Sequence, residues 1–308
     1  VNVIYKRDST WAMRYIGGNQ VFAFERMFSE HGILAPRCVK AFRDGRHFVA
    51  TNGDIVVHDG SVAQSVADQR VRAHIFDNID PTYYQTAYVV PNYSQEEMWF
   101  CYPTSGASLP NTAAIYNVKS NAWSFRDLKD SIHIGYGVVN ISAETYNGLT
   151  GTYEDQTGIY DSLSYNPTQY ELLQAEHEGT TSNSQFNKMD DSNRFDGVNY
   201  NAYLERTGLD VAAIGPGGLI QDPSIVKDIE EAYIKLQGGD VNIYFAAVET
   251  LGQSYNWGSP QTFYPGQGDY KVDVRVNGRY WGYKIESQTG VSWRLNSVEP
   301  DIIAEGQR

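Results

Sequence analysis

The stretch Arg46–Gly60, RHFVATNGDIVVHDG, contains two short apolar runs on either side of Asn52-Gly53. Both residues of this pair tolerate a positive φ, so together they are a strong signal for a two-residue hairpin turn. The stretch therefore predicts a strand, a tight turn and a second strand that ends at Asp59-Gly60. It leaves two interpretations open: one hairpin of a repeated all-β module, or an acidic loop that binds a metal ion.

The same pattern recurs along the first half of the chain. Groups of short apolar runs, separated by turn residues, begin near residues 38, 84 and 132, so the spacings are 46 and 48 residues. This period is typical of the four-stranded antiparallel blades of a β-propeller. The predicted strands are 38–42, 47–51 and 55–58, then 84–90, 98–102, 113–116 and 122–125, then 132–139, 145–150 and 158–160.

The composition also favours an all-β protein. The chain has 308 residues with 23 Tyr and 28 Gly, and these residue types suit pleated, half-buried surfaces and tight turns respectively. Cys38 and Cys101 both lie in apolar runs, which predicts buried thiols rather than a disulfide framework. We expect six aromatic side chains to be buried anchors of the sheets: Phe48, Trp99, Tyr116, Trp123, Trp281 and Trp293.

The net charge of −13 is unevenly distributed. Residues 1–50 carry 8 basic and 4 acidic groups, whereas residues 151–250 carry 5 basic and 17 acidic groups. An acidic protein does not attract nucleic acid through its overall field, so tight binding to the phosphate backbone is excluded on this basis. The simplest interpretation of the acidic middle region is a solvated surface.

The strand pattern stops between residues 166 and 226, where polar and acidic residues dominate. We predict three regions: blades over 1–165, an insertion or extended loop region over 166–226, and further blades over 227–308 that close the propeller. A long polar segment within an ordered domain usually makes functional contacts. The strands predicted in the last region are 231–236, 241–248, 270–276, 280–286 and 291–295.

The sequence does not favour a metal site or a catalytic site. Asn52, Asp54 and Asp59 lack the alternate spacing and closing Glu of a calcium loop, and the acids of Met189–Gly197 are irregularly spaced. The six histidines do not form a zinc-binding spacing, and neither a nucleophile elbow nor a phosphate-binding loop is present. We therefore expect a protein that is not an enzyme and has no cofactor or metal.

Three motifs in order carry a resemblance to a known family. The segment 10–71 contains Gly32, Ala35-Pro36-Arg37, Gly45, Phe48, Gly53, Asp59-Gly60 and Arg70-Val71. It is followed by EEMWFCYPTSGASLPNTAAIYNVKSNAWSF at 96–125 and by VNGRYWGYKIESQTGVSWRLNSVEPDIIAEGQR at 276–308. This series resembles the tail nozzle proteins of short-tailed bacteriophages (podoviruses), which are also called tail hub or packaged-DNA-stabilising proteins.

The resemblance implies a β-propeller subunit of a homo-hexameric ring in the virion tail, assembled in the host cytoplasm. In this family the ring lies below the portal and adaptor proteins, beside tailspike or fibre and tail-tip proteins. It forms the distal channel that retains packaged DNA and conducts it into the host. Viral DNA passes through this channel without sequence-specific binding.

Five acids of the polar region are the candidate channel or assembly residues, and we expect them to be exposed: Glu176, Glu178, Asp190, Asp191 and Asp196. They could line the channel, contact a neighbouring tail protein or lie in a disordered segment. Two other functions stay open: a carbohydrate-binding or carbohydrate-cleaving propeller that acts at the host surface, and a generic scaffold propeller.

Overall fold

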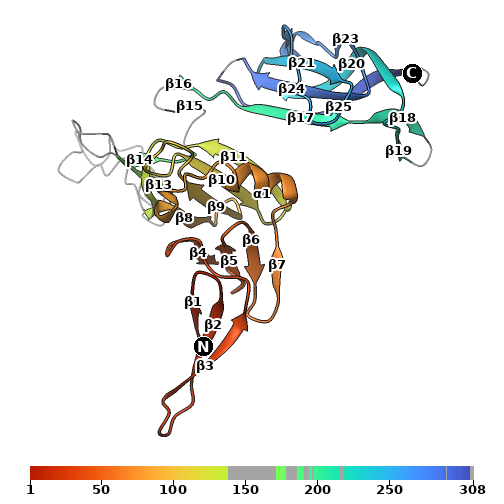
Figure 1. Cartoon of the computed structure of the whole chain (residues 1–308). Coiled ribbons are helices and arrows are strands. Elements are labelled where there is room, and N and C mark those ends of the chain that lie inside the picture. The colour runs from red at the N-terminus through yellow and green to blue at the C-terminus, as the bar shows by residue number, and fades with distance from the viewer. Residues whose placement is uncertain are drawn as a thin grey trace, which may run out of the picture. The chain divides into compact units, whose positions relative to one another are not determined.

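The structure is a computed structural model, and the protein is all-β (Figure 1). Its strands form antiparallel sheets, and the chain divides into two compact units, Val1–Met189 and Asp190–Arg308. Each unit has its own hydrophobic core. The structure describes residues 1–137, 171–177, 186–190, 194–195, 198–215, 218–288 and 290–305.

The first unit begins with a three-stranded arm. Its strands are β1 (Asn2–Tyr5), β2 (Thr10–Tyr15) and β3 (Phe22–Phe28), in the order β1-β2-β3. The β2–β3 hairpin runs beyond the end of β1 (Figure 1). Gly17 and Gly18 both have a positive φ at the turn of this hairpin, a backbone conformation that glycine adopts without steric cost.

The second sheet confirms the hairpin predicted at Arg46–Gly60. Gly53 has a φ of +102°, and the Thr51 N–H donates to the carbonyl oxygen of Asp54 across the turn. The sheet has the order β4-β5-β6-β7. Its strands are β4 (Val39–Ala41), β5 (His47–Ala50), β6 (Ile55–His58) and β7 (Ala63–Ser65).

The third sheet confirms the second predicted set of strands, with small shifts at their ends. Its order is β11-β10-β9-β8, so it too follows the chain strand by strand. The first turn of the predicted strand 84–90 is instead the 3₁₀ helix η1 (Tyr84–Thr86). The strands are β8 (Tyr88–Asn92), β9 (Glu97–Tyr102), β10 (Thr112–Asn117) and β11 (Ala122–Asp127).

The fourth sheet has the order β12-β13-β14 and starts at the strand predicted from residue 132. Its strands are β12 (Ser131–Gly137), β13 (Glu171–Glu176) and β14 (Phe186–Lys188). The other two strands predicted for this set, 145–150 and 158–160, lie outside the described residues.

These last three sheets stack face to face, with the third in the middle. Side chains of the third sheet alternate between two cores: Val89, Phe100 and Ala114 pack with Phe48 and Val57 of the second sheet. Their neighbours along the strands pack with β12 and β13 of the fourth sheet; they are Tyr88, Trp99, Cys101, Ala113 and Ile115. The runs of consecutive apolar residues within β8–β10 are therefore explained by burial on both faces.

One helix of the described chain was not predicted. Helix α1 (Gln69–Phe76) follows β7, and the carboxylate of Asp68 accepts a hydrogen bond from the Val71 N–H at its first turn. Asp68 is thus an N-cap, which stabilises a helix by satisfying an otherwise unpaired amide. Ile75 is fully buried in the first core, and Val71 and Phe76 pack against the same core, so three apolar side chains hold this short helix on the sheets.

The second unit packs two antiparallel sheets around one core. One has the order β17-β24-β21-β22 and the other β23-β20-β25. The C-terminal strands predicted from the sequence are confirmed, although β20 and β25 are longer than expected. The strands are β17 (Tyr203–Leu209), β20 (Val226–Gly238), β21 (Val241–Val248), β22 (Gln261–Phe263), β23 (Lys271–Gly278), β24 (Tyr280–Ser287) and β25 (Trp293–Glu305).

Two hairpins and a single 3₁₀ turn complete the described elements of this unit. They are β15 (Arg194–Phe195) with β16 (Val198–Asn199), β18 (Val211–Gly215) with β19 (Gly218–Gln221), and η4 (Pro265–Gln267). Residues 166–226, expected as an insertion or extended loop, therefore contribute strands such as β13 and β17 to sheets. Burial alternates along β13 (Glu171–Glu176), but the polar residues on either side of it led the sequence analysis to predict no strand there.

The expected aromatic anchors are mostly buried. Phe48, Trp99, Tyr116 and Trp281 are at most 7% exposed. Trp123 and Trp293 are only partly buried. Trp123 differs because it lies at the rim of the first core, where its indole N–H reaches the carbonyl oxygen of Val66 at 2.9 Å.

Candidate functional site

The arm is an amphipathic sheet with one apolar face. The strand register places Met13 opposite Phe24 and Tyr15 opposite Phe22. Directly opposite residues in an antiparallel pair point to the same face, and Trp11 joins them because it lies two residues before Met13. Such alternation normally buries the apolar face against another surface.

The outer end of the arm exposes apolar side chains to solvent. On this face Tyr15, Phe22 and Phe24 are 74%, 47% and 58% exposed. Ile16 and Val21, the next residues towards the turn, alternate to the opposite side and are 55% and 49% exposed. The rings of Tyr15 and Phe22 meet edge to face with centroids 6.0 Å apart. We refer to these five residues as the hairpin tip. Exposed apolar groups concentrated in this way usually mark an interaction site.

The inner end of the arm is fixed by a tyrosine between two histidines. The Tyr5 hydroxyl lies 2.5 Å from Nδ1 of His47 and 2.7 Å from Nε2 of His58. Nδ1 of His58 is buried without a hydrogen-bond partner. A bare nitrogen lone pair is less costly there than an unpaired N–H, so we infer that His58 Nε2–H donates to Tyr5, whose hydroxyl donates to His47.

Burial shifts the pKa values of all three side chains, Tyr5, His47 and His58. Desolvation, followed by the nearby His47, lowers the pKa of His58 to about 4, and the adjacent Asp59 opposes this only in part. Desolvation lowers the pKa of His47 as well and raises that of Tyr5. The cluster is therefore built to hold neutral side chains, and Phe28 packs on His58 with ring centroids 5.1 Å apart.

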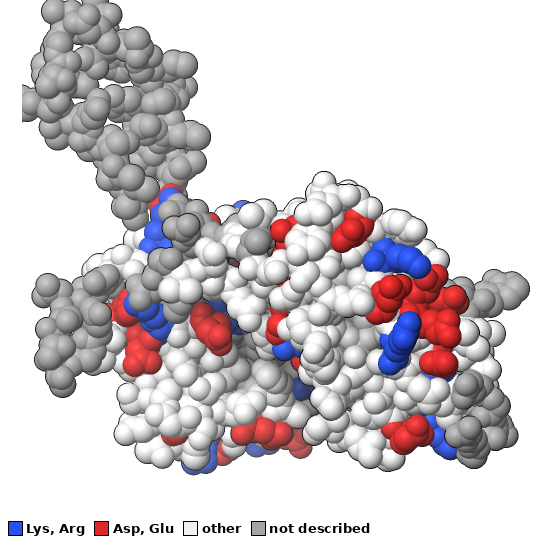
Figure 2. Space-filling view, turned by 90° about the horizontal axis from the view of Figure 1, so that it is seen from above, with Lys and Arg blue, Asp and Glu red and all other residues white. Residues whose placement is uncertain are grey.

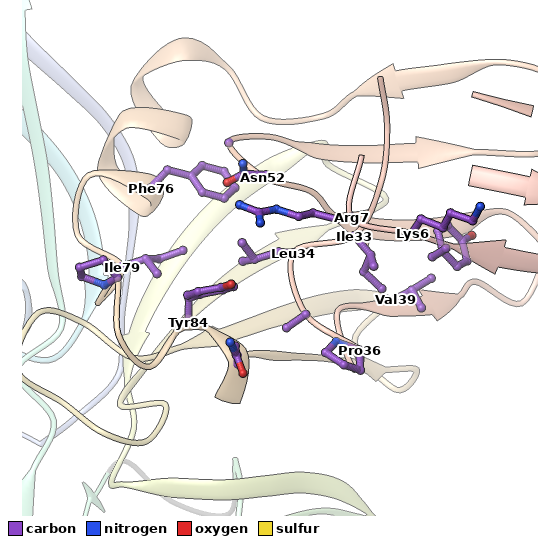
Figure 3. A pocket seen from close by; sticks show the side chains of 15 residues that line it. Lys6, Arg7, Ile33, Leu34, Pro36, Val39, Asn52, Phe76, Ile79 and Tyr84 are labelled. Carbon is purple, nitrogen blue, oxygen red and sulfur yellow. The ribbon is translucent and has the colours of Figure 1, made fainter. Parts of the chain in front are cut away.

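A pocket of about 850 Å³ opens beside this junction (Figure 3). Backbone hydrogen bonds from Ile33 to Lys6 and from Leu34 to Ala50 hold its walls at 2.9 Å each. Its lining is mostly apolar, with two basic side chains and no acidic one. The lining residues are Tyr5, Lys6, Arg7, Ile33, Leu34, Ala35, Pro36, Val39, Asn52, Gly53, Phe76, Ile79, Pro81, Tyr84 and Gln85. We call this the base pocket.

Arg37, from the Ala35-Pro36-Arg37 motif, joins three sheets of the first unit. Its guanidinium donates to the carbonyl oxygens of Ile132 and Thr86 and lies 5.4 Å from the ring centre of Tyr88. The chain thus uses this motif to hold the second, third and fourth sheets together.

The predicted acidic residues do not form one group. Glu176 is 5% exposed, so the expectation that it is an exposed acid is wrong. Its carboxylate is enclosed because it pairs with Lys129 at 3.0 Å and accepts a hydrogen bond from Asn187 at 2.5 Å. Asp190 is exposed, and its φ of +60° places it in a turn. Glu178, Asp191 and Asp196 lie outside the described residues.

The two acids of Arg46–Gly60, Asp54 and Asp59, accept hydrogen bonds that stabilise turns. One Asp59 oxygen accepts hydrogen bonds from the Ser61 and Val62 amides, and these bonds hold the pKa of Asp59 far below its usual range. Asp54 accepts from the Ile55 amide and the Ser65 hydroxyl. Of the two interpretations of this stretch, the structure confirms the hairpin. Within the described residues, no group of three or more His, Cys, Asp or Glu side chains is arranged to hold a metal ion.

Acidic and basic side chains lie next to one another in small groups on the face shown in Figure 2. In the second unit, Lys271 pairs with Glu231 and Lys235 pairs with Glu299 on the outer face of one sheet. Such exposed pairs contribute little to stability, but they neutralise part of the surface charge. Among the described helices, none is long and apolar enough to span a membrane.

In comparisons with known proteins, no family model and no curated protein matches the chain.

Sequence reasoning missed the hairpin tip and the base pocket. The signal for the tip was present in YIGGNQVF at 15–22, where two alternating runs flank a Gly-Gly-Asn turn. The pocket had no comparable signal, because its walls come from separate segments between Tyr5 and Gln85.

Proposed function

We propose that this chain is a virion structural protein, a tail nozzle or hub subunit whose sheets are blades of a β-propeller. The observation that carries the proposal is the stacking of three successive antiparallel sheets, each following the last along the chain. Successive propeller blades pack in this way around their axis. The ordered sequence motifs point to the same family.

The proposed role needs a stiff subunit that does not adhere to DNA. Stiffness is provided by contacts between sheets, such as Arg37 with Ile132 and Trp123 with Val66. A net charge of −13 disfavours tight binding to phosphates, because each cation–phosphate contact adds affinity. DNA therefore slides past the subunits in the channel that we propose.

In this proposal the subunits form a closed ring, with a hexamer as the expected size. The ring contacts portal or adaptor proteins on one side and tailspike, fibre or tip proteins elsewhere in the tail. The protein performs no catalysis and needs no cofactor; its function lies in retaining DNA and then conducting it into the host.

One observation favours a second candidate, carbohydrate binding at the host surface. On the outer face of the β17–β24–β21 sheet, the Lys284 ammonium lies 5.3 Å and 5.8 Å from the ring centres of Tyr203 and Tyr244. Tyr244 also donates to Glu286. Aromatic rings beside hydrogen-bonding groups are suited to sugars. A glycan array with the Tyr203→Ala and Tyr244→Ala variants separates this candidate from the nozzle.

A test of the nozzle proposal uses lysine at four acids: Glu178, Asp190, Asp191 and Asp196. Glu176 is left unchanged because it is buried and its replacement would disturb folding. We expect particles to assemble and to release their genome more slowly, since new cations would bind the passing phosphates. Normal release kinetics would contradict a channel position for these acids, and failure of the tail to assemble would place them at a neighbour contact.

A further inference from the structure

We propose that the hairpin tip of one copy of this chain inserts into the base pocket of a second copy. The inference rests on the proposed function only in taking a second copy as the occupant, because a ring requires repeated contacts between copies. It adds the two surfaces that make the contact.

The exposed area of the tip is large enough to contribute to a specific interface. A buried aromatic side chain covers roughly 150–250 Å², so Tyr15, Phe22 and Phe24 at their observed exposures leave about 350 Å² in water. Ile16 and Val21 raise this to about 500 Å². With an equal area on the pocket side, the contact reaches about 1,000 Å², the lower limit for a specific interface.

The base pocket offers the matching shape and chemistry. Its volume of about 850 Å³ lies within the range of pockets that enclose a ligand. Side chains of Leu34, Ile79 and Tyr84 point into it (Figure 3). An aromatic pair from the tip would therefore replace water at an apolar wall, the arrangement in which aromatic anchors contribute most to binding.

The tip cannot reach the pocket of its own chain. The pocket borders Tyr5, at the end of β1, where the arm is held by His47 and His58. Strands rise about 3.3 Å per residue, so the six residues of β2 hold the tip about 20 Å from that junction. The hydrogen-bonded hairpin would have to break to fold back.

This contact joins different surfaces of two copies, so it is head-to-tail. Each copy gives a tip and receives one. Such heterologous contacts close into rings when the rotation between copies allows it, and they otherwise form open filaments. A symmetric dimer would instead bring two tips together.

Cysteine cross-linking distinguishes these geometries. One variant of the full chain carries Val21→Cys in the tip and the other carries Gln85→Cys at the pocket rim; both positions are exposed. The native Cys38 and Cys101 are buried. We expect disulfide-linked dimers when the two variants are mixed and oxidised, at least tenfold more than with either variant alone. Cross-linking of Val21→Cys with itself at an equal or higher level would overturn the proposal.

Tip variants give an independent measurement. Tyr15→Ser with Phe22→Ser should raise the dissociation constant of self-association by about 100-fold in sedimentation experiments, since loss of each buried aromatic anchor typically exceeds tenfold. Val62→Ser is the matched control, because Val62 is 66% exposed and lies outside both surfaces. Circular dichroism confirms that all variants fold.

Three results contradict the inference in different ways. If the chain forms rings that the tip variants leave unchanged, the tip–pocket contact is wrong while the nozzle proposal survives. If the chain stays monomeric at its highest soluble concentration and the mixed cysteines do not cross-link, the contact is wrong. If the tip instead confers binding to lipid vesicles in the monomer, its partner is a membrane and not a second copy.

Discussion

Glu176 is buried, unlike the exposed Asp190, because its carboxylate binds partners from two other segments. Lys129 precedes β12, and Asn187 lies in β14, so the carboxylate joins both sides of β13. Removing it would leave the Lys129 ammonium, itself only 26% exposed, without this counter-charge. Breaking a buried pair from one side is strongly destabilising.

We predict that Glu176→Ala lowers the free energy of unfolding by about 2–3 kcal/mol, because the ion pair with Lys129 and the hydrogen bond from Asn187 are both lost. Chemical denaturation measures this change. Glu30→Ala is the control: Glu30 is exposed, and its substitution should stay within about 0.5 kcal/mol. An equal effect of the two substitutions would show that Glu176 is not a structural residue.

The His58 cluster predicts a pH dependence of stability. In the unfolded chain a histidine titrates near its usual pKa of about 6.5, whereas burial and the facing His47 and His31 hold the pKa of folded His58 at about 4. As the pH falls below about 6.5, His58 binds a proton in the unfolded state but stays neutral in the folded state. Stability is therefore fully present above about pH 6.5 and is lost between about pH 6.5 and 4.

We expect this group to account for about 2 kcal/mol of that loss, less than the full shift because the cluster is partly solvated. The measurement compares urea unfolding of the protein and of His58→Gln at several pH values from 7.5 to 4. The amide of Gln can still bond Tyr5 but does not titrate. If the two curves fall in parallel, His58 does not control the acid response.

At the scale of elements, side chains at the edges of the sheets hold one sheet to the next. Trp123, on β11, packs against Tyr116 and Phe48 with tilted rings, and its indole N–H donates to the carbonyl oxygen of Val66, just after β7. We predict that Trp123→Ala costs about 3 kcal/mol of unfolding free energy, and that Trp123→Phe costs about 1 kcal/mol through the lost hydrogen bond. Phe186→Ala, at a 78% exposed ring, is the control and should be nearly neutral. Thermal and denaturant unfolding of the three variants decide the matter, and unchanged stability of Trp123→Ala would refute this role.

The junction between arm and body depends on a glycine. A Cβ at Gly32 would lie 2.0 Å from the carbonyl oxygen of Arg7, a distance that only backbone movement can relieve. We predict that Gly32→Ala costs at least about 2 kcal/mol and detaches the arm. Gly135→Ala is the control, since the nearest atom to its added Cβ is 3.9 Å away. Proteolysis within residues 1–31 reports detachment; equal resistance of the two variants would show that the junction tolerates the methyl group.

The sequence was informative where one rule determined the local structure. Gly53 in the Asn52-Gly53 pair adopts the positive φ that a tight hairpin turn requires, and the consecutive apolar residues within 84–125 form strands that are buried on both faces. It failed at α1, whose position is set by the burial of Ile75 and an Asp68 cap rather than by a long helical pattern. It also failed at Glu176, because exposure was inferred from a polar neighbourhood while the partners lie in distant strands.

At the scale of the whole chain, the two units have separate hydrophobic cores. The base pocket, the hairpin tip and the stacked sheets all belong to the first unit. The second unit buries a lysine, Lys227, whose ammonium donates to the carbonyl oxygens of Asp222 and Arg279. Burial lowers the pKa of Lys227, and these bonds tie the start of β20 to the turn before β24.

Imaging of the assembled particle tests most directly the proposal that copies of this chain form the distal tail channel. The measurement is electron cryomicroscopy of particles labelled with an antibody fragment against the full chain. We predict a closed ring of labelled subunits around a central channel at the distal end of the tail. Particles that carry no label there, or a labelled subunit that lies away from the channel as a monomer, would contradict the proposal.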